Sequence, residues 1–289
     1  MKTRRAIYQF IAIYLFLLPA AADTAENDIF WQIYHRPPGI FIDGEFAGKG
    51  FVQKALHEVT SRLPQYQHIM VRTSLARALM DIQNQKQVCH PALFKTPERQ
   101  TFIEFSVASL VHPTNRLVMR RSLARILFHD NVGTINLLSL LNNEKLTFAL
   151  IHERKFGANI DQFMAQVNLG DRLVSIPSEN LDNMLNMVSR GRTDITIAYP
   201  FEIEHFNQAL QKPYETLDTF VIEDVPAYSM GYIACPDNDW GKTVINDINN
   251  VLRRIRHKPD YRNAITTWWR EEAKAPNFAQ YYEQVFLEN

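Results

Sequence analysis

The sequence predicts an α/β protein in which short apolar strands alternate with amphipathic helices. Apolar runs bounded by polar or glycine-containing turns recur from residue 29 to residue 235, as buried strands do. Between these runs, apolar residues recur at helical spacing, as in Val52, Ala55, Leu56 and Val59. The composition is that of an ordinary globular protein, and the length suits two lobes or one large domain.

The first residues of the chain predict a secretory signal peptide. Lys2, Arg4 and Arg5 precede an apolar run at residues 6–18, and small residues that suit signal-peptide cleavage follow at 20–22. The apolar run is too short for a comfortable membrane span. No cysteine follows closely enough to carry a lipid anchor. We therefore expect residues 1–22 to be removed and the mature protein to be soluble and exported.

The patterns of apolar residues predict the following strands and helices. Strands are expected at 29–34, 67–71, 89–94, 117–119, 146–151, 173–176, 195–200 and 217–222, with further extended runs ending at 106 and 235. Helices are expected at 51–63, 74–84, 122–128, 135–141, 160–167, 181–189, 244–257 and 261–269. Thr73 or Ser74 would cap the second helix. Near the end of the chain, four large aromatic residues are expected to pack rather than to line a site: Trp268, Trp269, Tyr281 and Tyr282.

Charge and motifs exclude several classes of function. The chain carries 31 basic and 31 acidic residues, and loss of the signal peptide removes three basic residues. A slightly acidic mature chain argues against nucleic acid as a partner, because no excess positive charge is available to neutralise phosphates. No nucleophile elbow, phosphate-binding loop or zinc-protease motif occurs, and the nine histidines are scattered. We expect neither a cofactor nor a metal.

Residues 89–106 are the most informative stretch. An apolar strand leads into a polar turn that contains Pro97 and Arg99, and a second extended run follows. Pro97 stops a helix, because it lacks a backbone donor and restricts its neighbour to extended geometry. Arg99 therefore lies on a loop between strands, where its planar guanidinium could hold a carboxylate with two parallel hydrogen bonds. The alternative is a surface salt bridge to Glu98 or Glu104.

This order resembles the extracellular solute-binding proteins of bacterial uptake systems, in the polar amino-acid-binding group (family 3) of the type II periplasmic binding fold. That family carries a Thr-x-x-Arg segment, here Thr96 to Arg99, and a Phe-Ser pair, here Phe105 and Ser106, before the chain crosses into a second lobe. The resemblance covers almost the whole mature chain. It implies two α/β lobes with mixed sheets, joined by two crossing strands, with lobe 1 at 23–112 plus 230–289 and lobe 2 at 113–229.

The resemblance also implies a set of ligand-binding residues. Arg99 would bind a ligand carboxylate, and Phe94 and Tyr199 would supply apolar walls. The helix start after Gly157 would offer N–H donors to an anion. Where the family has a hydroxyl beside that glycine, this chain has Ala158, and Arg154 would supply the donor instead.

Further candidate ligand-binding residues could instead be solvent-exposed or packed in the core. Tyr34, His35 and Arg36 lie before the proline loop, where the family contacts its ligand, and we take Arg36 as the candidate. Ser74 and Arg77, at the start of the second helix, could face the cleft. Ligand identity stays open, because the family's amino-binding aspartate is replaced by Tyr199. Glu202 and Glu204 are the acidic alternatives to that aspartate, but in this sequence they are out of register.

The two cysteines of an exported protein invite pairing. In the resembled fold, the strands that hold Cys89 and Cys235 lie in the same lobe, which favours a disulfide over two buried free thiols. Zinc is a poor alternative, because neither cysteine belongs to a ligand set at metal spacing.

The sequence thus predicts a monomeric periplasmic protein that closes over a small, carboxylate-bearing, amino-acid-like solute for ABC-type uptake or sensing. Its partners would be the solute and a membrane permease or receptor. The alternative is an exported enzyme of small acids, a dehydratase or hydrolase on the same fold. That enzyme would need an acid or base in the cleft, and His152, Glu153 and Glu202 are the candidates.

Overall fold

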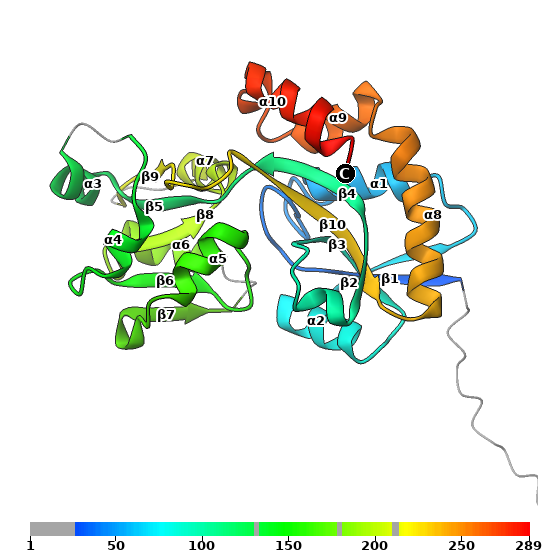
Figure 1. Ribbon diagram of the computed structural model, residues 1–289, viewed down its shortest axis with the longest axis horizontal. Coiled ribbons are helices and arrows are strands. Elements are labelled where there is room, and N and C mark those ends of the chain that lie inside the picture. Colours follow the sequence, from blue (N-terminus) through cyan, green and yellow to red (C-terminus); the bar gives the residue numbers. More distant parts are fainter. Residues whose placement is uncertain (1–26, 130–132, 178–180, 210–213) are drawn as a thin grey trace, which may run out of the picture.

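The computed structural model describes residues 27–129, 133–177, 181–209 and 214–289, so the expected signal peptide lies outside the described part. The described chain forms two bodies, each built on a five-stranded mixed sheet (Figure 1). The α/β class and the two-lobed arrangement predicted from the sequence are confirmed.

The first lobe contains the sheet with the strand order β2-β1-β3-β10-β4. Its strands are β1 (Asp28–Ile33), β2 (Gln67–Arg72), β3 (Val88–Leu93), β4 (Ile103–Pro113) and β10 (Tyr228–Pro236). The first three pair in parallel, whereas β10 runs antiparallel to both β3 and β4. Its helices are α1 (Phe51–Thr60), α2 (Leu75–Gln83), α8 (Asp239–Ile255), α9 (Pro259–Thr266) and α10 (Pro276–Tyr281), with 3₁₀ turns η1 (Arg99–Thr101) and η3 (Glu272–Lys274) and a π turn, η4 (Tyr282–Phe286).

The second lobe contains the sheet with the strand order β7-β6-β8-β5-β9. Its strands are β5 (Arg116–Arg120), β6 (Phe148–Ile151), β7 (Leu173–Ile176), β8 (Ile195–Ala198) and β9 (Leu217–Phe220). Its helices are α3 (Arg121–Phe128), α4 (Leu137–Leu141), α5 (Ala158–Ala165), α6 (Leu181–Ser189) and α7 (Pro200–Ala209), with a 3₁₀ turn η2 (Gly170–Arg172). The sequence predicted neither α7 nor, in the first lobe, α10.

Two long strands connect the lobes. In Figure 1, β4 and β10 run side by side from the first lobe toward the second, and they pair antiparallel over most of their length. Beyond the paired strands, Thr114 N donates to Ala227 O at 3.0 Å, and the Thr114 and Ser229 hydroxyls lie 2.6 Å apart. The sequence predicted an extended run ending at 235, and β10 is one continuous strand that also forms the return crossing.

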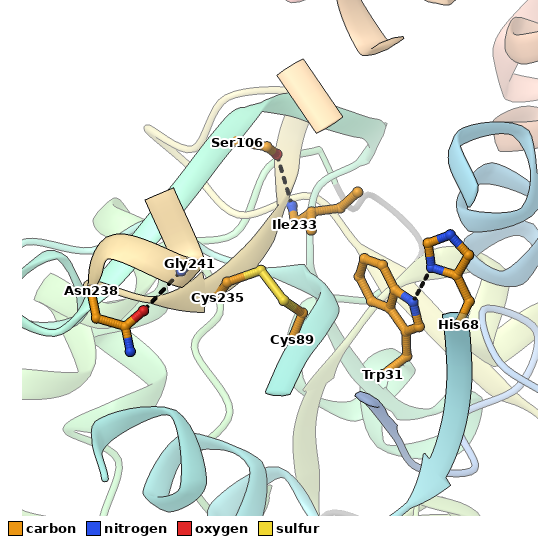
Figure 2. Close-up of a disulfide and its surroundings, with 8 residues drawn as sticks. All are labelled: Trp31, His68, Cys89, Ser106, Ile233, Cys235, Asn238 and Gly241. Carbon is orange, nitrogen blue, oxygen red and sulfur yellow. Dashed lines mark hydrogen bonds between the residues drawn. A yellow bond between two sulfur atoms is a disulfide. The ribbon is translucent and has the colours of Figure 1, made fainter. Parts of the chain in front are cut away.

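A disulfide joins two strands of the first sheet. Cys89 on β3 and Cys235 on β10 are bonded, with their Cα atoms 4.4 Å apart (Figure 2). Both cysteines are fully buried. The predicted pairing is confirmed, and it links residues that are 146 positions apart in the sequence.

The hydroxyl of Ser106 accepts a backbone hydrogen bond where the pairing of the two crossing strands is interrupted. The register between β10 and β4 shifts between Tyr232 and Ala234, so Ile233 N has no strand partner in that ladder. Ser106 Oγ accepts from Ile233 N at 3.0 Å instead (Figure 2). A buried backbone N–H needs such an acceptor. The Phe-Ser pair of the sequence thus has a structural role in the hinge strands.

Aromatic residues from the end of the chain pack in the core of the first lobe. Trp269 and Tyr282 are almost fully buried in it, and Tyr282 OH donates to Arg256 O at 2.6 Å. Trp268 and Tyr281 pack against the same core while partly exposed. The expectation that these four residues pack is therefore confirmed.

Candidate functional site

A narrow cavity lies between the two lobes, with a volume of about 40 Å³. Four cationic residues line it: Arg36, Arg99, Arg154 and Lys155. Six of the other lining residues are aromatic: Tyr34, Phe51, Phe94, His112, Tyr199 and Phe201. No acidic side chain from the described part of the chain is among the lining residues. The cavity therefore combines aromatic walls with an excess of positive charge.

Arg99 reaches from one lobe to the other. Its guanidinium donates through Nη1 to Phe94 O in the first lobe and through Nη2 to Glu153 O in the second, both at 3.2 Å. The residue is only 4% exposed, which rules out the alternative of a surface salt bridge. Its loop is tightened where Arg99 N donates to Thr96 Oγ1. Burial lowers the pKa of Arg99, but the ordinary value is so high that the group stays charged.

Arg154 forms a buried ion pair with Glu202. Arg154 Nη2 lies 2.7 Å from Glu202 Oε2, and the two side chains are 5% and 1% exposed. Tyr199 N also donates to Glu202 Oε2, at 3.0 Å, and Arg154 Nη2 donates to Asn115 Oδ1. The guanidinium lies over the Tyr199 ring, 4.9 Å from its centre. This cluster connects the hinge residue Asn115 with the loop after β6 and the start of α7.

Arg36 follows β1 in a short turn, in which Arg36 and Ile40 exchange two backbone hydrogen bonds of 2.9 Å. Its guanidinium lies 5.6 Å from the centre of the Tyr34 ring. Burial acts to lower the pKa of Arg36, but Tyr34, Glu202 and Tyr199 outweigh it and raise the pKa above its ordinary value. Arg36 is therefore a charged group within electrostatic reach of the Arg154–Glu202 pair.

An aromatic cluster forms one wall of the cavity. Tyr199 stacks on Phe201 with ring centres 4.9 Å apart, and the His112 ring meets Tyr199 edge-on at 4.7 Å. Phe201 packs edge-on against Phe51 of the first lobe at 5.2 Å. Burial lowers the pKa of His112 to about 4 and raises that of Tyr199 to about 12. Both side chains are therefore neutral near pH 7.

The other candidates from the sequence lie apart from the cavity lining, except Phe94, which lines it. Ser74 caps α2, and its hydroxyl accepts from Arg77 N at 3.2 Å. The Arg77 side chain is 55% exposed and pairs with Asp81. Neither residue lines the cavity.

Gly157 precedes α5 with a positive φ of 115°, which favours glycine. Beside it, the carboxylate of Asp161 accepts from Phe156 N at 3.0 Å. Asp161 lies in the first turn of the helix, so its carboxylate stabilises the positive end of the helix dipole. The helix start that the sequence offered to a ligand anion thus already holds a carboxylate of the chain itself. Gly157 does not line the cavity.

Sequence reasoning missed several residues of this site. Glu202 was set aside as out of register, yet it is buried against Arg154. Asn115, His112, Lys155 and Phe201 were not considered. The one available signal was the pair of adjacent cations in His-Glu-Arg-Lys at 152–155, directly after a buried strand.

Among the described residues, no group of three or more histidines, cysteines, aspartates or glutamates could hold a metal ion. In the same part of the chain, no helix is long and apolar enough to cross a membrane.

Solved structures with the same fold cover most of this chain. A mutant of ArgBP from T. maritima is 18% identical, with 85% of this chain and 96% of that chain covered and a TM-score of 0.64. A histidine kinase sensor domain described as similar to periplasmic binding proteins is 12% identical, with 84% and 96% covered and a TM-score of 0.66. The ancestral amino acid-binding protein AncCDT-1, a precursor of cyclohexadienyl dehydratase, is 14% identical, with 84% and 96% covered and a TM-score of 0.65. No protein-family model and no curated protein matches the sequence.

The two sheets, the paired crossing strands and the cavity between the lobes define a bilobal binding fold. It is the type II periplasmic binding fold, as the sequence predicted, and the solved structures that share it include amino-acid-binding proteins and a sensor domain.

Proposed function

We propose that this protein is an exported solute-binding protein that encloses a small, carboxylate-bearing solute between its lobes. The observation that carries the proposal is the position of Arg99, buried between the lobes and in hydrogen-bond contact with both. A guanidinium in that position would bind a carboxylate through charge-assisted hydrogen bonds, which are roughly twice as strong as neutral ones. One solute could then hold both lobes together.

Export is supported by the signal-peptide sequence and by the Cys89–Cys235 disulfide, since disulfides persist in oxidising compartments such as the periplasm. We infer that the mature protein acts there as a monomer and passes its solute, or a signal, to a membrane permease or receptor. Both uses occur among proteins of this fold: one similar structure is the substrate binding protein of an amino acid ABC transporter, and another is a sensor domain.

Binding is a better account of the cavity than catalysis. His152 and Glu153, two candidates for a catalytic acid or base, pair with each other at 3.2 Å with side chains 62% and 45% exposed. Glu202, the third, is held by Arg154 and Tyr199 N. None of the three lines the cavity. The enzyme alternative therefore has no observation in its favour.

Calorimetric titration with short-chain carboxylates and amino acids tests the proposal. We expect Arg99→Gln to weaken binding of the best solute about 10-fold or more, because a hydrogen bond to a charged group contributes about 1.5–3 kcal/mol. Arg62→Gln is the matched control, since the Arg62 side chain lies just after α1, is 41% exposed and forms its ion pair locally with Glu58. Equal affinity of Arg99→Gln and the wild type for a solute that binds would contradict the proposal.

A further inference from the structure

The charges around the cavity do not balance. Arg154 is neutralised directly by Glu202, and Lys155 Nζ lies 3.6 Å from Glu98 Oε2. Among the described residues, no carboxylate oxygen lies within ion-pair distance of Arg36 or Arg99. The cavity lining thus presents two guanidinium groups that lack a direct anionic partner.

The acids that influence these two arginines from further away are engaged elsewhere. Glu98, Asp161 and Glu153 act on Arg99 electrostatically, and Glu202, which is paired with Arg154, acts on Arg36. Each has a closer partner, which is Lys155 for Glu98, Phe156 N for Asp161 and His152 for Glu153. Glu98 and Glu153 are also largely exposed, so solvent screens them. The positive charge inside the cavity is therefore compensated only weakly.

The two unpaired arginines share one neighbourhood. Both act on the buried His90, whose pKa falls to about 3 because of burial first and then the charges of Arg36 and Arg99. His90 Nδ1 accepts from Ala92 N at 3.1 Å, so the ring proton lies on Nε2, which has no hydrogen-bond partner among the described residues. The imidazole is therefore neutral and relieves neither positive charge. Two like charges in a partly buried space favour a ligand that carries two negative charges.

No carboxylate from the described part of the chain lines the cavity to pair with an ammonium group. The nearest buried carboxylate, Glu202, gives Oε2 to Arg154 and Tyr199 N. Its Oε1 has no partner, but that atom is buried and Glu202 does not line the cavity. An ammonium would therefore meet Arg36 and Arg99 without a compensating carboxylate.

We propose that the solute is a small dicarboxylate without a cationic amino group, whose two carboxylates pair with Arg36 and Arg99. This inference rests on the proposed function and narrows it. The aromatic side chains Phe94 and Tyr199 would cover the apolar carbons between the two carboxylates. The solute would bring the two negative charges that the cavity lacks.

A matched set of solutes tests the inference by calorimetry. Succinate, L-aspartate and butyrate have the same chain length, and they differ in an added ammonium or a lost carboxylate; malonate, glutarate and adipate vary the spacing. We expect the best dicarboxylate to bind about 10-fold or more tightly than its amino acid or monocarboxylate counterpart, since each charge-assisted pair contributes about 1.5–3 kcal/mol. An amino acid that binds as tightly as the dicarboxylate of equal length overturns the inference, as does the failure of every dicarboxylate to bind.

Variants separate this inference from the proposed function. Arg36→Gln should reduce the preference for dicarboxylate over monocarboxylate about 10-fold, and Arg36→Lys, which keeps the charge, should retain part of it. Arg62→Gln should leave the preference unchanged. Thermal unfolding of each variant checks that it is folded. If Arg99→Gln abolishes carboxylate binding but Arg36→Gln keeps the full preference, the proposed function stands and this inference fails. If binding is insensitive to Arg99, the proposed function fails as well.

Discussion

Breaking the Arg154–Glu202 ion pair should show how much this pair contributes to the stability of the folded protein. Arg154→Met leaves the Glu202 carboxylate, 1% exposed, with Tyr199 N–H as its remaining donor. The change also removes the donor to Asn115 Oδ1. Loss of one partner of a buried pair costs about 3–5 kcal/mol, because an uncompensated charge stays buried. We therefore expect Arg154→Met to lower the free energy of unfolding by about 3–5 kcal/mol.

The double variant Arg154→Met/Glu202→Met isolates the interaction. It removes both charges and keeps similar volume, a replacement that is often close to neutral. Two polar groups, Tyr199 N–H and Asn115 Oδ1, would still lose partners at about 1–3 kcal/mol each. Even so, we expect the double variant to be less destabilised than the sum of the single variants by about 2 kcal/mol.

Urea unfolding followed by circular dichroism, at neutral pH and without added solute, measures all four proteins of this cycle. Arg62→Met serves as the control for loss of an exposed pair and should change stability by no more than about 1 kcal/mol. Single-variant costs that simply add up in the double variant would refute the argument, because they would show that the two side chains are not coupled.

Three further predictions concern stability, and they involve the disulfide and Ser106 of the first lobe and His112 of the cavity wall. Reduction of the Cys89–Cys235 disulfide, or its replacement by two serines, should lower the free energy of unfolding by about 2–5 kcal/mol, and an unchanged urea midpoint would contradict this. Ser106→Ala removes the acceptor of Ile233 N–H and should cost about 1–3 kcal/mol in the same assay; a cost near zero would mean that another acceptor replaces the hydroxyl. His112 should make stability depend on pH, because the unfolded chain takes up a proton near pH 6.5 that the folded protein refuses until about pH 4. Acidification through this window should therefore destabilise the wild type more than His112→Gln, and equal pH profiles would exclude the role of His112.

Much of the fold follows from local patterns in the sequence. β7 and α6 have the bounds expected from an apolar run and from helical spacing. The loop position of Arg99 also follows from local order, because Pro97 stops a helix between two strands, whereas its place between the lobes was implied by the resemblance to the solute-binding family. These features depend on residues close to one another in the chain, where propensity and periodicity are informative.

The partners of Arg154 could not be found in this way. Arg154 and Glu202 are 48 residues apart and belong to different elements. From the sequence, Glu202 and Glu204 were out of register with Tyr199 at the end of the expected strand. The chain instead begins α7 at Pro200, a favoured first position of a helix. The helical turn brings the Glu202 carboxylate back to Tyr199 N–H. Glu202 was misplaced because the chain changes from strand to helix spacing at Pro200.

The contacts between the lobes indicate what a solute would add. Phe201 of the second lobe is buried in the core of the first, and Arg99 already donates to Glu153 O across the gap. These contacts join the two lobes directly. A carboxylate that accepted from Arg99 would add an ion pair to these contacts. A solute can shift the balance between open and closed forms only by its differential affinity for them. Because Arg99 meets both lobes only when they are together, its bond to a solute would supply that difference in affinity.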